Sequence, residues 1–97
     1  MKKIIIILLS SLLIPCEDSV VTLTMEDSWG DGWNGNTFCL NSDCATLQNG
    51  SYGTEDFCID LSVENSIICD GGNWQSEIFW SLSDPQGVTI ATGGAPF

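Results

Sequence analysis

Residues 21–26 read VTLTME, and apolar and polar side chains alternate along the whole stretch. Successive side chains of a β-strand point to opposite faces, so Val21, Leu23 and Met25 would share one face of an extended chain. The stretch therefore predicts a strand that is buried on one face and exposed on the other.

Further short strands are predicted on the C-terminal side of this one. They fall at residues 37–40, 45–47, 56–61, 66–69 and 78–83 and from residue 88 to the Gly93-Gly94 pair, and are separated by turns rich in Gly, Asn, Asp and Ser. No segment shows sustained helical periodicity, and Trp80 alternates with core positions. We expect one all-β domain: a small antiparallel β-sandwich, jelly-roll-like, with about seven short strands.

The N-terminus predicts a secretory signal peptide at residues 1–16. Lys2 and Lys3 precede an apolar run at 4–14, which is too short to span a bilayer. We place the cleavage after Cys16, so that the secreted domain comprises residues 17–97. An N-terminal anchor or a buried core helix is the alternative.

Cysteine spacing predicts a disulfide framework in the secreted domain. Cleavage after Cys16 would leave four cysteines, an even number that suits an oxidising compartment. Of the three possible connectivities, spacing favours Cys39–Cys44 together with Cys58–Cys69, the second of these joining the two strands of a hairpin. A zinc site is the less favoured alternative, because no C-x2-C pair is present.

The charge balance excludes several functions. The chain has 13 acidic residues, two lysines, no arginine and no histidine, for a net charge of −11. Removal of the leader would remove both lysines and lower the charge to −13. Such a protein would be repelled by nucleic-acid phosphates and by anionic membranes. Histidine- and lysine-based catalysis would be impossible. Paired carboxylates, as in glycosidases, are the remaining alternative, but they need a cleft that a domain of this size rarely provides. We therefore expect no enzymatic activity.

Residues 27–36 read DSWGDGWNGN and form the most informative loop. Asp and Asn supply the hard oxygen ligands that Ca²⁺ requires, and Gly permits tight turns. The predicted metal ligands are Asp27, Asp31, Asn34, Asn36 and, from a later loop, Glu77. Glu26 is the alternative to Glu77 as the residue that completes the site. The spacing does not fit an EF-hand. The alternative is an Asx-rich turn whose side chains bond to their own backbone.

Tryptophans in and near this loop suggest a ligand-binding surface. Trp29 and Trp33, with Asn34, have the composition of many sugar-binding surfaces, where an indole stacks on a pyranose ring. Trp74 lies in the loop at residues 70–77, which we expect to sit beside the first loop. The alternative is that one or both of the first two indoles fill the end of the sandwich.

Three strings give the chain a resemblance to a known module. LTMEDSWGDGWNGNTF, GGNWQSEIFWSL and GVTIATGGAPF occur in this order and cover about half of the domain. The chain resembles a secreted β-sandwich module, with a D-S-[WY]-G-D-G-W-N-G hallmark, of extracellular proteins from aquatic microbes, algae and protists. The resemblance implies an extracellular accessory or structural module and no particular reaction. The chain departs from the usual pattern at Glu26, where an aromatic or small residue is expected.

Two functions follow as competing expectations. The first is a secreted, Ca²⁺-supported binding module that recognises a glycan or another cell-surface or matrix component. The second is a structural subunit of an extracellular filament or surface coat, in which residues 17–26 pair with a neighbour's open sheet edge. Asn49 begins an N-x-[ST] sequon, so we expect either glycosylation or an ordinary Asn-Gly turn there.

Overall fold

The computed structural model of the protein describes residues 16–97. The predicted signal segment therefore lies outside the described residues, except for Cys16. Seven strands and one short 3-10 helix follow in chain order: β1 (Ser19–Asp27), β2 (Thr37–Leu40), β3 (Asp43–Ala45), β4 (Tyr52–Ile59), β5 (Ile67–Asp70), η1 (Gln75–Glu77), β6 (Ile78–Ser83) and β7 (Thr89–Gly93).

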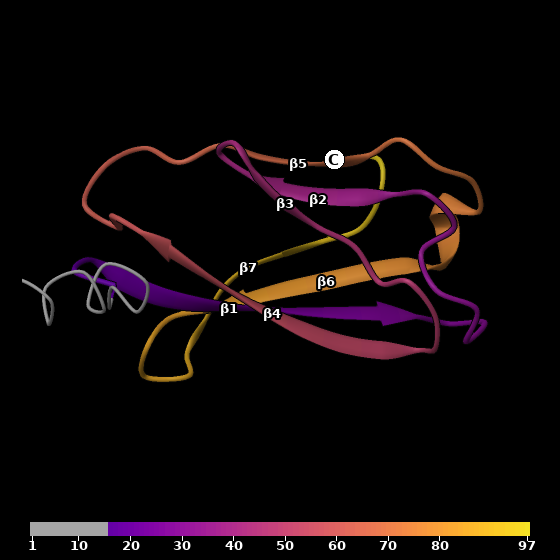
Figure 1. Ribbon diagram of the computed structural model, residues 1–97, viewed down its shortest axis with the longest axis horizontal. Coiled ribbons are helices and arrows are strands. Elements are labelled where there is room, and N and C mark those ends of the chain that lie inside the picture. Colours follow the sequence, from indigo (N-terminus) through magenta and orange to yellow (C-terminus); the bar gives the residue numbers. More distant parts are fainter. Residues whose placement is uncertain (1–15) are drawn as a thin grey trace, which may run out of the picture.

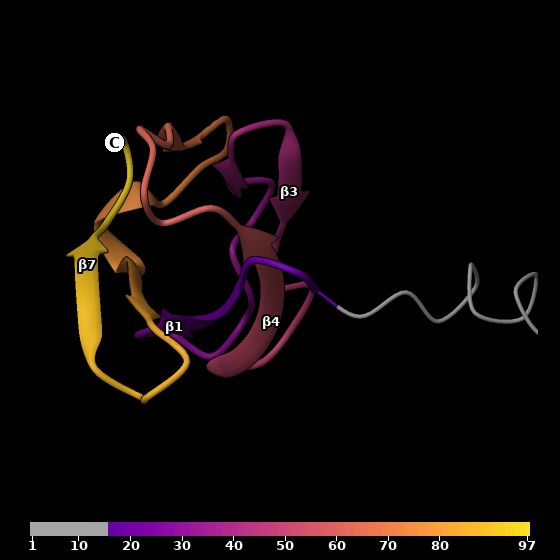
Figure 2. The same ribbon diagram turned by 90° about the vertical axis from the view of Figure 1, so that its left-hand side faces the viewer.

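The strands form two antiparallel sheets that pack face to face. One sheet has the order β4-β1-β6-β7 and the other has the order β3-β2-β5. Figure 1 shows the four-stranded sheet below the three-stranded one, and Figure 2 shows the two layers from one end. The predicted all-β sandwich of seven short strands is confirmed. In residues 16–97, no helix has the length and apolar composition needed to cross a membrane.

The alternation in residues 21–26 is the basis of the core. Val21, Leu23 and Met25 are buried between the sheets, whereas Thr22 and Thr24 lie on the outer face. This strand is central in its sheet, because β1 pairs with both β4 and β6. Residues 22–26 therefore have both edges occupied within their own domain, whereas residues 19–21 pair with β4 alone.

Aromatic side chains fill the space between the two sheets. Trp80 and Phe38 are fully buried, and their ring centroids lie 4.9 Å apart at an interplanar angle of 66°. Edge-to-face packing of this kind contributes beyond simple burial of area. The Trp80 indole N–H donates to the Gly94 carbonyl at 2.9 Å, so its polar atom is paired inside the fold. The predicted burial of Trp80 is confirmed.

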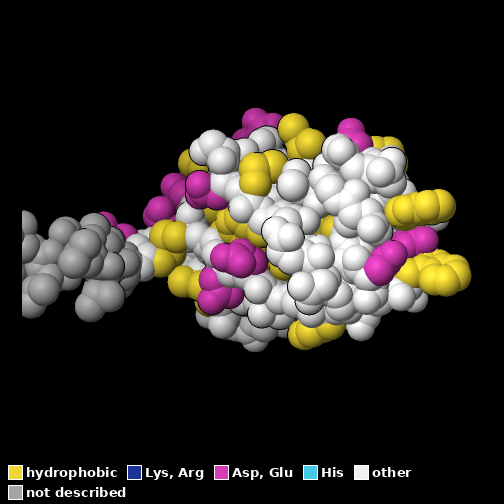
Figure 3. Space-filling view, turned by 45° about the vertical axis from the view of Figure 1, so that its right-hand side comes forward, with side chains coloured by type: hydrophobic (Ala, Val, Ile, Leu, Met, Phe, Trp, Pro, Cys, Tyr) yellow, Lys and Arg dark blue, Asp and Glu magenta, His cyan; other side chains and the backbone are white. Residues whose placement is uncertain are grey.

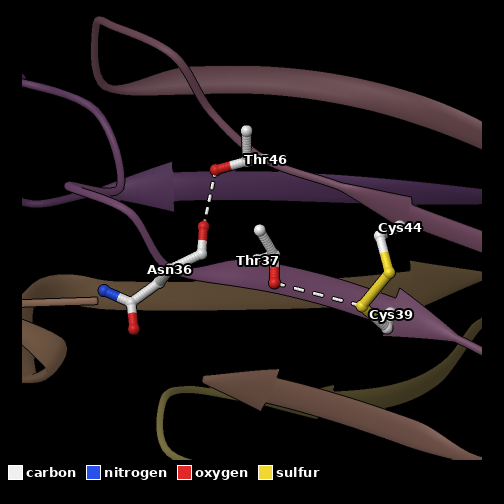
Figure 4. The surroundings of a disulfide bond; sticks show 5 residues. All are labelled: Asn36, Thr37, Cys39, Cys44 and Thr46. Carbon is white, nitrogen blue, oxygen red and sulfur yellow. Dashed lines mark hydrogen bonds between the residues drawn. A yellow bond between two sulfur atoms is a disulfide. The ribbon is translucent and has the colours of Figure 1, made fainter. Parts of the chain in front are cut away.

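The Cys39–Cys44 disulfide is confirmed. The two cysteines face each other across β2 and β3, with Cα atoms 4.0 Å apart (Figure 4). Beside them, the Thr46 hydroxyl donates to the Asn36 carbonyl at 2.6 Å. The disulfide joins β2 to β3, and the hydrogen bond ties the residue after β3 to the residue before β2.

The predicted Cys58–Cys69 disulfide is wrong. The two cysteines lie on strands of different sheets, since β4 pairs with β1 and β5 pairs with β2. Cys58 points out of the sandwich, whereas Cys69 is fully buried in the core with a free thiol. Burial raises the pKa of the Cys69 thiol to about 11, and the neighbouring Asp70 carboxylate adds to this shift. The spacing suited a hairpin, but the two strands do not form one.

Cys58 is instead bonded to Cys16, with the Cα atoms 5.5 Å apart. This bond fastens the start of β1 to the end of β4, two strands that already pair along their length. A cleavage after Cys16 would separate this cysteine from the domain. A leader cleavage compatible with the disulfide therefore falls before Cys16.

The end of the chain closes the sandwich on the side of β5. Phe97 and Cys69 exchange two backbone hydrogen bonds, of 3.0 and 2.8 Å. Figure 1 shows the C-terminus beside β5, after the chain has left β7 in the other sheet. The Phe97 ring also packs edge-on against Trp80, with centroids 5.1 Å apart. These contacts connect the two sheets.

Candidate metal and ligand site

The loop after β1 is shaped by residues that tolerate a positive φ. Gly32 has a φ of 84° and packs closely against the backbone of Gln48. A Cβ atom at Gly32 would come within 2.6 Å of the Gln48 carbonyl oxygen. Its N–H donates to the Gly50 carbonyl at 2.9 Å. Only glycine fits here, because a side chain would be both strained and obstructed. The loop is thereby held against residues 48–50.

The loop at residues 70–77 docks directly on the loop at residues 27–36, as predicted. The Asn73 N–H donates to the Asn34 carbonyl at 3.1 Å, and the Ser28 N–H donates to the Glu77 carbonyl at 3.1 Å. Gly72 lies so close to residues 34–36 that a Cβ atom there would collide with their backbone. These contacts bring Glu77, which is remote in sequence, beside the first loop.

Asn36 connects the two loops and is fully buried. Its side-chain amide donates to the Trp33 and Asn73 carbonyls, both at 2.8 Å. Its side-chain oxygen accepts hydrogen bonds from the Gly72 N–H at 2.9 Å and from the Gln75 amide at 3.0 Å. Every polar group of this side chain is therefore used inside the protein. The structure gives Asn36 a structural role in place of the predicted role as a metal ligand.

Three of the predicted metal ligands do come together. Asp27, Asp31 and Glu77 each offer a carboxylate oxygen, and these oxygens all lie within 4.8 Å of one another. Asp27 is the last residue of β1, Asp31 lies in the following loop, and Glu77 ends η1. The three carboxylates form a group that can hold a metal ion.

Two oxygens of this group are buried without a hydrogen-bond partner. They are Oδ1 of Asp27 and Oε1 of Glu77, and they are the only such side-chain atoms among residues 16–97. The other Asp27 oxygen accepts a hydrogen bond from the Asp31 N–H at 2.8 Å. Asp27 is only 3% exposed. A buried carboxylate oxygen without a partner is costly, so these two atoms mark a place that a cation would stabilise.

The electrostatics of Glu77 agree with this arrangement. Burial raises its pKa above the ordinary value, and the nearby charges of Asp31 and Asp27 raise it further. Without a cation, Glu77 therefore holds a proton more tightly than a free glutamate does.

Two exposed indoles flank the carboxylates on one side. Trp29 is 76% exposed and Trp74 is 65% exposed, and together with Asp31 and Glu77 they line a surface cleft. Figure 3 shows acidic side chains beside projecting hydrophobic side chains at this end of the molecule. Trp74 has a φ of 54°, in the left-handed region, which is unusual for a bulky residue. The structure thus brings together Trp29 and Trp74 as predicted.

Trp33 does not belong to this surface. Its side chain is fully buried, and its indole N–H donates to the Glu26 carbonyl at 3.0 Å. The prediction that Trp33 contacts a ligand is wrong, because no face of its ring is accessible for stacking. Trp33 instead fills the end of the sandwich, which was the alternative stated for one or both indoles of this loop.

Asn34, a predicted metal and glycan ligand, lies beside the carboxylate group. Asn34 is half-buried with a φ of 51°, and its side-chain amide donates to the Asp31 carboxylate at 3.4 Å and to the Gly32 carbonyl at 3.3 Å. It therefore contacts a carboxylate of the group through its nitrogen.

Asn49 is exposed in the turn before Gly50, so its sequon is accessible, and its glycosylation stays a prediction.

A second cleft, which the sequence analysis missed, adjoins the same carboxylates. It is lined by Glu26, Asp27, Tyr52, Glu77 and Phe79, together with two serines. Tyr52 and Phe79 are exposed aromatic residues on the strands that border β1. A signal was present in the sequence only for Phe79, which occupies an outward position of an alternating segment. Tyr52 lies in the part of β4 that does not alternate.

Comparisons with protein-family models, with characterised proteins and with solved structures found no match.

Proposed function

We propose that the protein is a secreted, non-catalytic binding module in which Ca²⁺, held by Asp27, Asp31 and Glu77, supports recognition of a glycan or another cell-surface or matrix component. The observation that carries this proposal is the pair of buried, unpartnered oxygens on Asp27 and Glu77. A divalent cation would offset most of the charge of three converging carboxylates in a domain whose described residues include no Lys, Arg or His.

Calcium suits this donor set better than a transition metal does. The group offers only carboxylate oxygens, and hard cations prefer oxygen ligands, whereas zinc is usually held by cysteine or histidine. Ca²⁺ takes 6–8 oxygen ligands in flexible geometry, and three carboxylates can supply up to about six. The remaining positions would be filled by water or by oxygens of a bound ligand.

Trp29 and Trp74 supply the surface for a glycan. Both rings are largely exposed, and they share a cleft with Asp31 and Glu77. An indole face can stack against the C–H face of a pyranose ring, while carboxylates accept hydrogen bonds from its hydroxyls. Ligand sites generally combine such apolar walls with a few well-placed polar groups.

The extracellular location rests on the disulfides and the leader. Cys16–Cys58 and Cys39–Cys44 fit an oxidising compartment. The resemblance to the DSWGDGWNG-type module also favours an extracellular role, and its hallmark residues are those of the loop that holds Asp27 and Asp31. Residues 16–97 contain no histidine or lysine that could act as a base or nucleophile, which supports a non-catalytic role.

The competing role as a filament or coat subunit loses its predicted mechanism. Residues 17–26 were expected to pair with a neighbour's sheet edge, yet residues 22–26 are paired on both sides within their own sheet. Strand addition would have to use another strand. The site geometry therefore favours the binding module.

A glycan array probed with and without Ca²⁺ tests this function. We expect binding to a defined set of glycans in Ca²⁺, lost in EDTA and lost in Trp29→Ala and Trp74→Ala. Val88→Ala is the matched control, because Val88 is also exposed but lies in the turn before β7. Glycan binding that is unchanged in EDTA would refute the role of the cation, and an array without any binding would refute glycan recognition.

A further inference from the structure

Three side chains form a row across the outer face of the four-stranded sheet. Glu26 on β1 lies directly opposite Tyr52 on β4 and opposite Phe79 on β6. Residues paired in this way point to the same face, and neighbouring strands lie about 4.8 Å apart. Glu26 is therefore flanked on both sides by an aromatic ring. Tyr52 is 65% exposed and Phe79 is 45% exposed.

The cleft beside this row is strongly acidic. Asp27 and Glu77 line it together with Glu26, and each of the first two has a buried oxygen without a hydrogen-bond partner. No Lys, Arg or His occurs anywhere in residues 16–97, so nothing within the described fold can neutralise these carboxylates. The walls are thus aromatic, and the polar groups of the cleft include three carboxylates.

We propose that this cleft binds a basic side chain of a partner polypeptide, with arginine preferred over lysine. A planar guanidinium can stack on an aromatic ring and pair bidentately with a carboxylate, and an ammonium can do only part of this. Tyr52 and Phe79 offer the ring faces, and Glu26 lies between them. Charge complementarity selects the partner, because an acidic surface repels an acidic segment and attracts a basic one.

This inference does not rest on the proposed glycan recognition. The glycan cleft is lined by Trp29 and Trp74, whereas the basic side chain would enter between Tyr52 and Phe79. The two clefts share Glu77, and the cation group also includes Asp27. Bound Ca²⁺ would reduce the negative charge of the second cleft, so the basic side chain binds best in the metal-free protein.

The test uses the folded protein in EDTA and the peptide N-acetyl-Gly-Arg-Gly-amide, followed by ¹H–¹⁵N NMR titration. The matched probe replaces arginine by citrulline, which keeps the shape and removes the charge. We expect the arginine peptide to shift signals of the strands around Glu26, Tyr52 and Phe79, and the citrulline peptide to bind more weakly. A Lys peptide should also bind, more weakly than the Arg peptide.

Three variants locate the binding. Glu26→Gln, Tyr52→Ser and Phe79→Ser should each weaken the affinity for the arginine peptide by roughly two- to five-fold, the range expected for one exposed cation–π or ion-pair contact. Glu64→Gln and Ile68→Ser are the controls, because both residues are exposed elsewhere on the molecule. Melting temperatures establish that each variant is folded.

The outcomes separate this inference from the metal site. Equal binding of the citrulline and arginine peptides would overturn it, because the charge would then not be recognised. Equal weakening by Glu64→Gln and Glu26→Gln would also overturn it, because binding would then reflect only the general negative charge of the protein. Binding of spermidine without binding of the peptide would identify a free polyamine as the ligand and also overturn it. Ca²⁺ titration in the same samples reports the cation separately, so either proposal can fail while the other stands.

Discussion

Asp27 and Glu77, fifty residues apart in the chain, bring carboxylate oxygens within 4.8 Å of each other, and each keeps one buried oxygen without a hydrogen-bond partner. This relationship depends on the docking of two loops. Asp27 ends the central strand of its sheet, and Glu77 is held beside it because the Ser28 N–H donates to the Glu77 carbonyl. The fold therefore maintains a repulsive pair that a cation would relieve.

The raised pKa of Glu77 predicts an unusual dependence of stability on pH. The folded state holds the Glu77 proton more tightly than the unfolded state, so this group contributes stability at low pH. That stability is lost as the pH rises through the folded pKa of Glu77. In EDTA, we therefore expect the unmodified protein to lose stability relative to Glu77→Gln as the pH rises.

Urea denaturation from about pH 4 to about pH 8 measures this difference. Hydrogen bonds lower the pKa values of Asp60 and Asp70, so the stability that these two groups contribute to the protein is lost as the pH falls. Because this effect opposes that of Glu77, the variant and the unmodified protein must be compared at each pH. Glu64→Gln removes the same charge at an exposed position and serves as the control. A constant difference between Glu77→Gln and the unmodified protein across this range would contradict the account of Glu77.

Replacement of Asn36 by alanine should destabilise the fold. The change would leave the Gly72 N–H and the Trp33 and Asn73 carbonyls without their side-chain partner. A buried polar group left unpaired costs about 1–3 kcal/mol, so we expect a loss of at least this size in the free energy of unfolding. Chemical denaturation measures it.

Gln86→Ala is the control for Asn36, because Gln86 is exposed in the turn between β6 and β7. It should change the free energy of unfolding by no more than about 0.5 kcal/mol. An Asn36→Ala protein as stable as this control would show that Asn36 does not join the two loops as described.

The two disulfides should differ in their contribution to stability. Loop-closure entropy predicts that removal of Cys16–Cys58, with a sequence separation of 42, costs about 4 kcal/mol. Removal of Cys39–Cys44, with a separation of 5, should cost about 2 kcal/mol. Double Cys→Ser variants at each bridge, compared by denaturation, check this order.

Peptide mapping of the disulfides is an independent check of the connectivity. Cys69 is buried with a pKa of about 11, so alkylation should label it only after the protein is denatured. Recovery of a fragment that joins Cys58 to Cys69 would contradict the structure.

The strands could be predicted from the sequence because alternation reports directly on burial. The VTLTME stretch predicted β1, and the buried positions of Trp80 and Leu82 followed from the same reasoning. The pairing of strands could not be predicted in the same way. Residues 57–69 looked like a hairpin, whereas β4 and β5 belong to different sheets, and this is why the partner of Cys58 was missed.

The candidate site was predictable in composition and only partly in geometry. Asp27, Asp31 and Glu77 converge as expected, because the loop at residues 70–77 docks on the loop at residues 27–36. The same loop contains Trp29, which is exposed, and Trp33, which is buried, and nothing in local sequence distinguishes them. Asn36 likewise has the residue type of a metal ligand, and only the structure shows that its side chain is used in four hydrogen bonds within the protein.

The most direct test of the central claim is the melting temperature in EDTA compared with that in millimolar Ca²⁺. A ligand that binds only the folded state at about 100 times its dissociation constant adds about 2.7 kcal/mol, enough to raise the melting temperature of a small domain by several degrees. We expect this rise in the unmodified protein and in Glu64→Gln, and its loss in Asp27→Asn. Identical melting temperatures in EDTA and in Ca²⁺ for the unmodified protein would contradict a calcium site at Asp27, Asp31 and Glu77.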